Sequence, residues 1–232
     1  MIEVSNNVTP SQYFLQHGCK LVPGTTSNTF TFKLLCLEKF LFVMIKAMRP
    51  RLIILNGPLG IGKSTLAKRY AQEHPLTLFL DIDEVWAMLS GWREEKEESA
   101  PLSKQMAIEM ARINLNAGYD VVIPQILQTA ELADNFMELA KTCSANYYEV
   151  LLLVTKEESI KRFIARSKSQ GHPTGFREGG IIATTGREEK LAKMYDAMME
   201  VASSRSHTIK IEPELGDIEG TYSELLHSIG RK

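Results

Sequence analysis

The sequence predicts an α/β fold in which a five-stranded parallel sheet is covered by helices on both faces. Two observations support this prediction. Short apolar runs alternate with segments whose apolar residues recur at helical spacing, which is the pattern of βαβ units. The runs are also apolar at nearly every position, as in strands buried on both faces. One glycine-rich, nonperiodic stretch, 166–188, interrupts the alternation and is expected to be a functional loop.

Each strand is expected from a short apolar run. The first, Arg51–Asn56, reads RLIILN and is followed by glycines, and the second, 75–83, ends in two aspartates. The other three strands are expected at 118–125, 147–155 and 207–212.

Helices are expected between the strands, with their apolar residues on one face. Thr155 and Glu158 form a capping box at the start of one of them. The others are expected at 64–74, 102–117, 132–140, 191–202 and 218–229. The buried face of 102–117 is expected to consist of Leu102, Met106, Met110 and Ile113.

Composition and charge restrict the class of protein. The 232 residues are 44% hydrophobic and 24% charged, enough for one domain with a good core. The net charge of -1 provides no basic face, so nucleic acid is not the expected partner. Three cysteines without CxxC spacing favour a reducing compartment, here the cytoplasm. Both a monomer and a homodimer stay open.

Residues 1–48 have a different character from the remainder. Their apolar part, FKLLCLEKFLFVMIKAM, contains Glu38, Lys39 and Lys46 and is too short and too charged to span a membrane. Two interpretations stay open: an amphipathic helix packed on the domain, or a segment outside the working protein, which would then start at Met44 or Met48. The working domain is expected over 49–232.

The stretch GPLGIGKS, Gly57–Ser64, matches the phosphate-binding pattern GxxxxGK[ST]. Glycines let successive N–H groups point at phosphate oxygens, and the following helix adds its positive end. Lys63 is expected to reach the β- and γ-phosphates, and the Ser64 hydroxyl to bind Mg²⁺. The expected nucleotide contacts are Gly57, Pro58, Leu59, Gly60, Ile61, Gly62, Lys63, Ser64 and Thr65.

These residues resemble the P-loop NTPases, and among them the small-molecule kinases, over about residues 50–230. The likeness to the kinases rests on Asp81-Ile82-Asp83, on ARxxLxxGxDVV (111–122) and on SIKRFIARS before the glycine-rich loop. Similar layouts occur in shikimate and gluconate kinases, chloramphenicol phosphotransferase, zeta-toxin-like AAA-type kinases and polynucleotide kinase. The resemblance implies a three-layer fold with sheet order 2-3-1-4-5, a lid over about 166–188, and ATP with Mg²⁺ as cofactors. It also implies transfer of the γ-phosphate to a hydroxyl of a small molecule.

Asp81 and Asp83 are expected at the sheet edge that carries the P-loop, because parallel strands all end on one edge. Strand alternation predicts that both point to one side. One carboxylate can organise Mg²⁺ through water, and the other can accept the proton of an attacking hydroxyl. The resemblance implies that Asp81 is the magnesium-side acid and Asp83 the base and substrate contact. The alternative is that Asp83 caps a helix begun by Glu84.

The third strand ends in Gln125, where many P-loop proteins have a magnesium-linked acid. An amide can hold a water or a substrate but does not balance the charge of Mg²⁺. Gln125 is therefore expected either to contact substrate or to bond to the nearby backbone.

Three arginines are candidates for contacts with the transferring phosphoryl group, which suits bidentate guanidinium groups. Arg162 and Arg166 are spaced i,i+4 on one helix face. The resemblance implies that Arg166 packs on adenine or holds phosphate, and that Arg162 and Arg177 close over the γ-phosphate. The alternative for all three is a solvated basic surface, and Arg112 is expected in a surface ion pair.

Some alternatives concern the acceptor. Trp86 and Trp92 either stack a ligand or pack beneath the acidic segment 93–99. The missing third-strand acid keeps open a nucleotide-dependent switch or toxin-like regulator that acts on a macromolecule. A polynucleotide end kinase also stays open, although the neutral charge argues against it.

Overall fold

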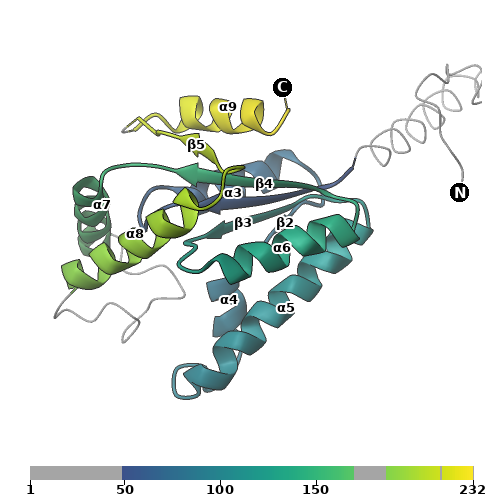
Figure 1. Ribbon diagram of the computed structural model, residues 1–232, viewed down its shortest axis with the longest axis horizontal. Coiled ribbons are helices and arrows are strands. Elements are labelled where there is room, and N and C mark those ends of the chain that lie inside the picture. The colour runs from purple at the N-terminus through teal and green to yellow at the C-terminus, as the bar shows by residue number, and fades with distance from the viewer. Residues whose placement is uncertain (1–48, 170–186, 215, 232) are drawn as a thin grey trace, which may run out of the picture. The chain divides into compact units, whose positions relative to one another are not determined.

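The computed structural model describes residues 49–169, 187–214 and 216–231. Within these residues five parallel strands form one sheet in the order β2-β3-β1-β4-β5, which confirms the predicted order (Figure 1). The strands are β1 Arg51–Asn56, β2 Leu78–Phe79, β3 Val121–Gln125, β4 Asn146–Leu152 and β5 Ile209–Ile211.

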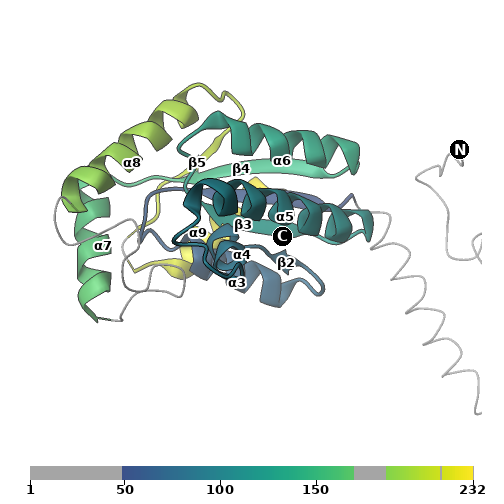
Figure 2. The ribbon, with the colours of Figure 1, turned by 90° about the horizontal axis from the view of Figure 1, so that it is seen from below.

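Helices cover both faces of the sheet. They are α3 Lys63–Glu73, α4 Ile82–Ala87, α5 Lys96–Asn116, α6 Ala130–Thr142, α7 Lys156–Ser169, α8 Arg187–Ser203 and α9 Ile218–Ser228. Helices α3 and α9 pack on one face, and α5, α6 and α8 pack on the other. Helix α7 lies beyond the carboxyl ends of the strands in both ribbon views (Figures 1 and 2). The three-layer fold predicted from the sequence is therefore confirmed.

Two predictions fall outside the described residues. They concern residues 1–48, and most of the lid over 166–188 together with Arg177. Among the described residues no helix is both long enough and apolar enough to cross a membrane.

The uniform hydrophobicity of β1 follows from its position at the centre of the sheet. Leu52 and Ile54 pack into the core formed with α5 and α6, while Ile53 and Leu55 pack into the core formed with α3 and α9. All four side chains are fully buried. A strand with two dry faces has no position for a solvated side chain, so its sequence shows no alternation.

Helix α5 begins at Lys96, earlier than predicted, and the predicted apolar face is observed only in part. Met106 and Met110 are partly buried and pack against the core. Ile113 is 71% exposed and Leu102 is 46% exposed. The buried residues are instead Ser99, Ser103, Ala107, Ala111 and Leu115. These mostly small side chains recur every fourth residue, so they form one stripe along which α5 packs closely against its neighbours α4 and α6. Periodicity of large apolar residues therefore identified two residues that pack against the core but missed the stripe of small residues.

A pair of substitutions tests which face of α5 is buried. Replacing Ala107 with Leu should lower the free energy of unfolding by about 1–3 kcal/mol, because the core has no room for the added atoms. Replacing Ile113 with Ala should change it by less than about 0.5 kcal/mol. Urea unfolding of the two variants measures the difference, and the opposite ranking would restore the predicted face.

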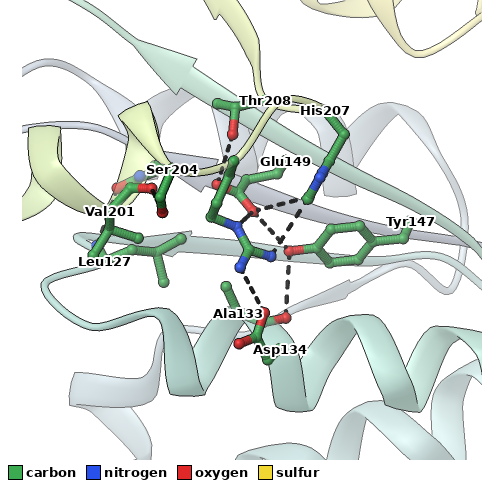
Figure 3. Close-up of polar contacts among 11 residues, drawn as sticks. Leu127, Ala133, Asp134, Tyr147, Glu149, Val201, Ser204, His207 and Thr208 are labelled. Atoms are coloured by element: carbon green, nitrogen blue, oxygen red, sulfur yellow. Dashed lines mark hydrogen bonds and ion pairs between the residues drawn. The ribbon is translucent and has the colours of Figure 1, made fainter.

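A network of polar groups around a buried carboxylate joins β4 to α6 and to the segment after α8 (Figure 3). Glu149 on β4 is fully buried; its carboxylate accepts hydrogen bonds from Arg205 Nε at 2.7 Å and from Thr208 Oγ1 at 3.0 Å. Arg205 also donates through Nη1 to Asp134 on α6 at 2.6 Å. The hydroxyl of Tyr147 adds a bond to Glu149 at 3.1 Å. The network thus fixes the segment after α8 against β4 and α6.

Removal of Arg205 tests this network. Arg205→Ala should lower the free energy of unfolding by about 3–5 kcal/mol, because it leaves the carboxylate of Glu149 buried without its cation. The control is Lys193→Ala, which breaks an exposed ion pair with Glu189 and should cost less than about 0.5 kcal/mol. Equal losses in the two variants, measured by urea unfolding, would contradict a stabilising role for the network.

A second polar cluster lies at the amino ends of the strands, remote from the edge that carries the glycine-rich loop. Asp120, just before β3, accepts a hydrogen bond from the backbone N–H of Arg51 at 2.8 Å. Its other oxygen accepts from the Tyr70 hydroxyl and from Arg231 Nη2, both at 2.6 Å. One buried carboxylate therefore binds residues close to both ends of the described chain.

Candidate active site

The glycine-rich loop connects the central strand β1 to the first turn of α3. Gly57 approaches β4 so closely that a Cβ atom there would lie 2.8 Å from the carbonyl oxygen of Leu152. Gly62, the residue before α3, has a φ of 104°, which side chains disfavour. Gly62 also has no side chain with which to cap α3, and an uncapped helix N-terminus is suited to bind an anion. The loop conformation thus requires glycine and exposes a phosphate-binding geometry.

Lys63, the first residue of α3, folds back over the loop. Its Nζ donates to the carbonyl oxygens of Gly57 at 2.7 Å and Pro58 at 2.8 Å. Ser64, the next residue, is half-buried, and Thr65 is exposed. The ammonium group is therefore already held above the loop that is predicted to receive the phosphates.

The two acids do not lie on a strand as predicted. Strand β2 ends at Phe79; the ladder continues only as far as the N–H of Leu80, which bonds to Val122 O at 3.0 Å. Asp81 is the N-cap of α4, and its Oδ1 accepts from the N–H of Asp83 at 3.1 Å. Asp83 lies in the first turn of α4. The alternative that Asp83 caps a helix begun by Glu84 is also wrong, because α4 begins at Ile82 and the cap is Asp81, whose side chain accepts from a free N–H group of the helix start.

Burial raises the pKa of both acids. The pKa of Asp83 rises to about 6, mainly through burial and then through the charge of Asp81, while the ammonium of Lys63 opposes the rise. The pKa of Asp81 is raised by burial and by Glu84, against the backbone N–H groups of its cap. The charge of Lys63 acts on Asp83, and Asp83 follows β2 at the sheet edge to which β1 carries the P-loop. The catalytic roles predicted for these two residues stay predictions.

The third strand contributes Gln125, which lies beside Asn56 of β1 in the sheet register. The Oε1 atom of Gln125 accepts from the N–H of Ile126 at 3.0 Å. The backbone interaction considered for this amide is therefore present.

Sequence reasoning missed Asn56, the last residue of β1. Its side chain is fully buried, and its Oδ1 accepts from the N–H of Gly57 at 2.8 Å and of Leu127 at 3.0 Å. This one oxygen thus joins the start of the P-loop to the segment after β3. Its Nδ2 is buried without a partner in the described part of the chain. The available signal was a polar residue that ends an apolar run directly before the first glycine.

Of the three arginines predicted to contact the phosphoryl group, the structure describes the side chain of Arg162 alone. Arg162 on α7 donates through Nε to Glu158 Oε1 at 2.8 Å. Arg166 lies within α7, but its side chain falls outside the described part, as does Arg177 altogether. Arg112 forms an exposed ion pair with Glu109 at 3.1 Å on α5, as expected of a surface residue.

The two tryptophans pack against each other. The rings of Trp86 and Trp92 lie 4.6 Å apart, and the Nε1 of Trp86 donates to the hydroxyl of Ser99 at 2.8 Å. These contacts hold the end of α4 against the start of α5, which agrees with the packing alternative. Among the described residues no three His, Cys, Asp or Glu side chains gather as a protein-only metal site.

Comparison with known proteins agrees with this geometry. The family model described as AAA domain matches residues 52–183, more than half of the chain. No curated protein matched the sequence. Helices and strands over most of the chain superpose on solved structures of low sequence identity, which shows a shared fold.

Three of these structures illustrate the likeness. Shikimate kinase from Acinetobacter baumannii, in complex with shikimate, is 19% identical with a TM-score of 0.52, over 80% of this chain and 96% of that one. Shikimate kinase from Bacteroides thetaiotaomicron is 19% identical with a TM-score of 0.54, over 77% and 98%. The tunicamycin resistance protein of Deinococcus radiodurans is 13% identical with a TM-score of 0.52, over 79% and 98%.

The P-loop between β1 and α3, the sheet order and the match to the family model lead to one assignment. The chain belongs to the AAA-domain family of P-loop NTPases.

Proposed function

We propose that the protein is an ATP-dependent kinase that transfers the γ-phosphate to a hydroxyl of a small molecule. The observation that supports this most directly is the place of Asp83 in the first turn of α4, after β2 and at the sheet edge that carries the P-loop, with its pKa raised to about 6. A P-loop alone fits any nucleotide-binding protein, whereas a transfer to a hydroxyl also needs a nearby base. A carboxylate with a pKa near neutrality suits that task.

The residues present fit a nucleotide with its magnesium ion. The N-terminal turn of α3 and the backbone from Gly57 to Thr65 would hold the phosphates. The hydroxyl of Ser64 and the carboxylate of Asp81 are hard oxygen ligands of the kind that Mg²⁺ accepts, directly or through water. The bound ion would neutralise phosphate charge during transfer.

The remaining groups would act on the acceptor and the transferring phosphoryl group. Asp83 would accept the proton of the attacking hydroxyl, and Lys63 would exchange its bonds to the loop carbonyls for the phosphates. Arg162, Arg166 and Arg177 would stabilise the charge of the phosphoryl group. Gln125 would contact the acceptor through its amide nitrogen. The working unit in this proposal is 49–232, with 166–188 as its lid.

A panel of acceptors tests the proposal. We expect one class of hydroxylated compound, among antibiotics, sugars, cyclic acids and nucleosides, to raise ADP release from Mg·ATP. Lys63→Ala and Asp83→Asn should each lower the stimulated rate by about 100-fold or more. Lys141→Ala, which breaks an exposed ion pair with Glu138, should leave it unchanged.

The panel also separates the alternatives. Nucleotide binding without a stimulating small molecule would favour a switch or a regulator acting on a macromolecule. Phosphorylation of oligonucleotide ends, with steep salt dependence, would favour an end kinase. Full stimulated activity in Asp83→Asn would refute the base assigned here.

The pH dependence provides a separate prediction. Below a pH of about 6 Asp83 holds a proton and cannot accept another, so the kcat/KM of the acceptor should fall as the pH falls through that value. A rate profile between pH 5 and 8 measures this limb, and a conservative change elsewhere should preserve it. A flat profile in the native protein would contradict the role of Asp83.

Stability provides the control for that profile. Because the pKa of Asp83 is raised in the folded state, its ionisation opposes folding, and this loss of stability appears as the pH rises through about 6. Asp83→Asn should therefore stabilise the protein at pH 8 relative to the native chain, but not at pH 4. A variant that is inactive yet more stable at pH 8 would show that loss of activity is not loss of fold.

A further inference from the structure

Helix α7 packs directly against the P-loop at Gly60. A Cβ atom on Gly60 would lie 3.2 Å from the backbone nitrogen of Phe163 and 3.6 Å from the carbonyl carbon of Arg162. The backbone of Arg162 is therefore in contact with the loop that is proposed to hold the phosphates. The side chain of Arg162 starts from this contact, so its direction decides whether its guanidinium can serve them.

Glu158 binds that side chain. Its Oε1 accepts the Nε–H of Arg162 at 2.8 Å, one helical turn away. The backbone N–H of Glu158 is itself fixed by Thr155 Oγ1 at 3.2 Å, at the first turn of α7. Glu158 is thus anchored to the start of the helix, and within the described residues the bond from Arg162 to Glu158 is made through Nε.

The contact differs from the surface ion pairs of the same spacing. The side chains of Arg162 and Glu158 are 19% and 30% exposed, whereas those of Lys193 and Glu189 on α8 are 75% and 71% exposed. A pair that is partly removed from water is screened less than an exposed pair. The Arg162–Glu158 pair is also less exposed than the i,i+4 pair of Arg69 and Glu73, whose side chains are 29% and 45% exposed.

We propose that Glu158 is a positioning residue that holds the guanidinium of Arg162 by Nε and so presents its two terminal nitrogens to the phosphoryl group on the P-loop. The inference rests on the proposed kinase function. A guanidinium is a planar fork whose terminal nitrogens match two phosphate oxygens, and a bond at Nε leaves that fork available. Fixing a long side chain before the nucleotide binds also removes part of the ordering cost of binding.

The experiment compares two nucleotide complexes. Affinities for Mg·ADP and for Mg·ADP with aluminium fluoride, which imitates the transferring phosphoryl group, are measured by calorimetry on the full chain. The variants are Glu158→Ala, Glu158→Gln, Arg162→Ala and the double variant Glu158→Ala with Arg162→Ala. The matched control is Glu189→Ala, which removes the acid of an exposed i,i+4 pair.

Glu158→Ala should weaken binding of the aluminium fluoride complex by about tenfold, with Mg·ADP affinity changed by less than about twofold. Glu158→Gln keeps an oxygen that accepts from Nε and should lose no more than about threefold. The double variant should be no weaker than Arg162→Ala alone, because Glu158 acts only through that arginine. Glu189→Ala should resemble the native protein.

Three results would overturn the inference. They are losses in Glu158→Ala that are equal for both complexes, losses that add to those of Arg162→Ala, and tighter binding in Glu158→Ala, which would mean that Glu158 restrains Arg162. In each of these cases the native protein still binds Mg·ADP, so the proposed function is not refuted. Failure of the native protein to bind Mg·ADP at all would instead refute the proposed function, and the role of Glu158 with it.

Discussion

Strand β1 pairs with β3 on one side and β4 on the other, and its six residues are all buried. Because the sheet is parallel, this central strand must end at the same edge as its neighbours. The P-loop, Gln125 and the carbonyl of Leu152 meet there for that reason. Asn56 converts the meeting into a defined junction, since its single oxygen holds the N–H groups of both Gly57 and Leu127. The geometry of the site therefore depends on the pairing of β1 with β3 and β4.

The parts that the sequence predicted well are those set by local rules. The P-loop and its flanking strand and helix depend on contiguous residues. The apolar run RLIILN alone indicates that both faces of its strand are buried. The acids were placed at the right edge but on the wrong element, because β2 ends at Phe79 and Asp81 already caps the next helix. The buried face of α5 was predicted only in part, because close packing selects small side chains, which periodicity of large residues ignores. Asn56 was missed because its partners are distant in sequence or are backbone groups.

The acidic side chains of the domain differ in whether a nearby cation compensates their charge. At the carboxyl edge of the sheet Asp83 is partly buried and lies close in sequence to Asp81, with only partial compensation from Lys63, and its pKa rises. Elsewhere the buried acids are compensated: Glu149 meets Arg205, and Asp120 meets Arg231. Unfavourable burial of charge is thus concentrated where proton transfer is proposed, as in sites that give up stability for reactivity. The compensated acids stabilise the elements on which that site depends.

The bonds of Asp120 have a consequence for how the chain is threaded. Arg51 and Arg231 stand at opposite ends of the described domain, yet both donate to this one carboxylate. The two ends are therefore neighbours, at the edge of the sheet remote from the P-loop. Joining them through a short linker and opening the chain at an exposed turn such as Gly91 would leave the order of strands in the sheet unchanged. The ends of the described domain are therefore far from the proposed active site, and moving them to another surface turn should leave that site intact.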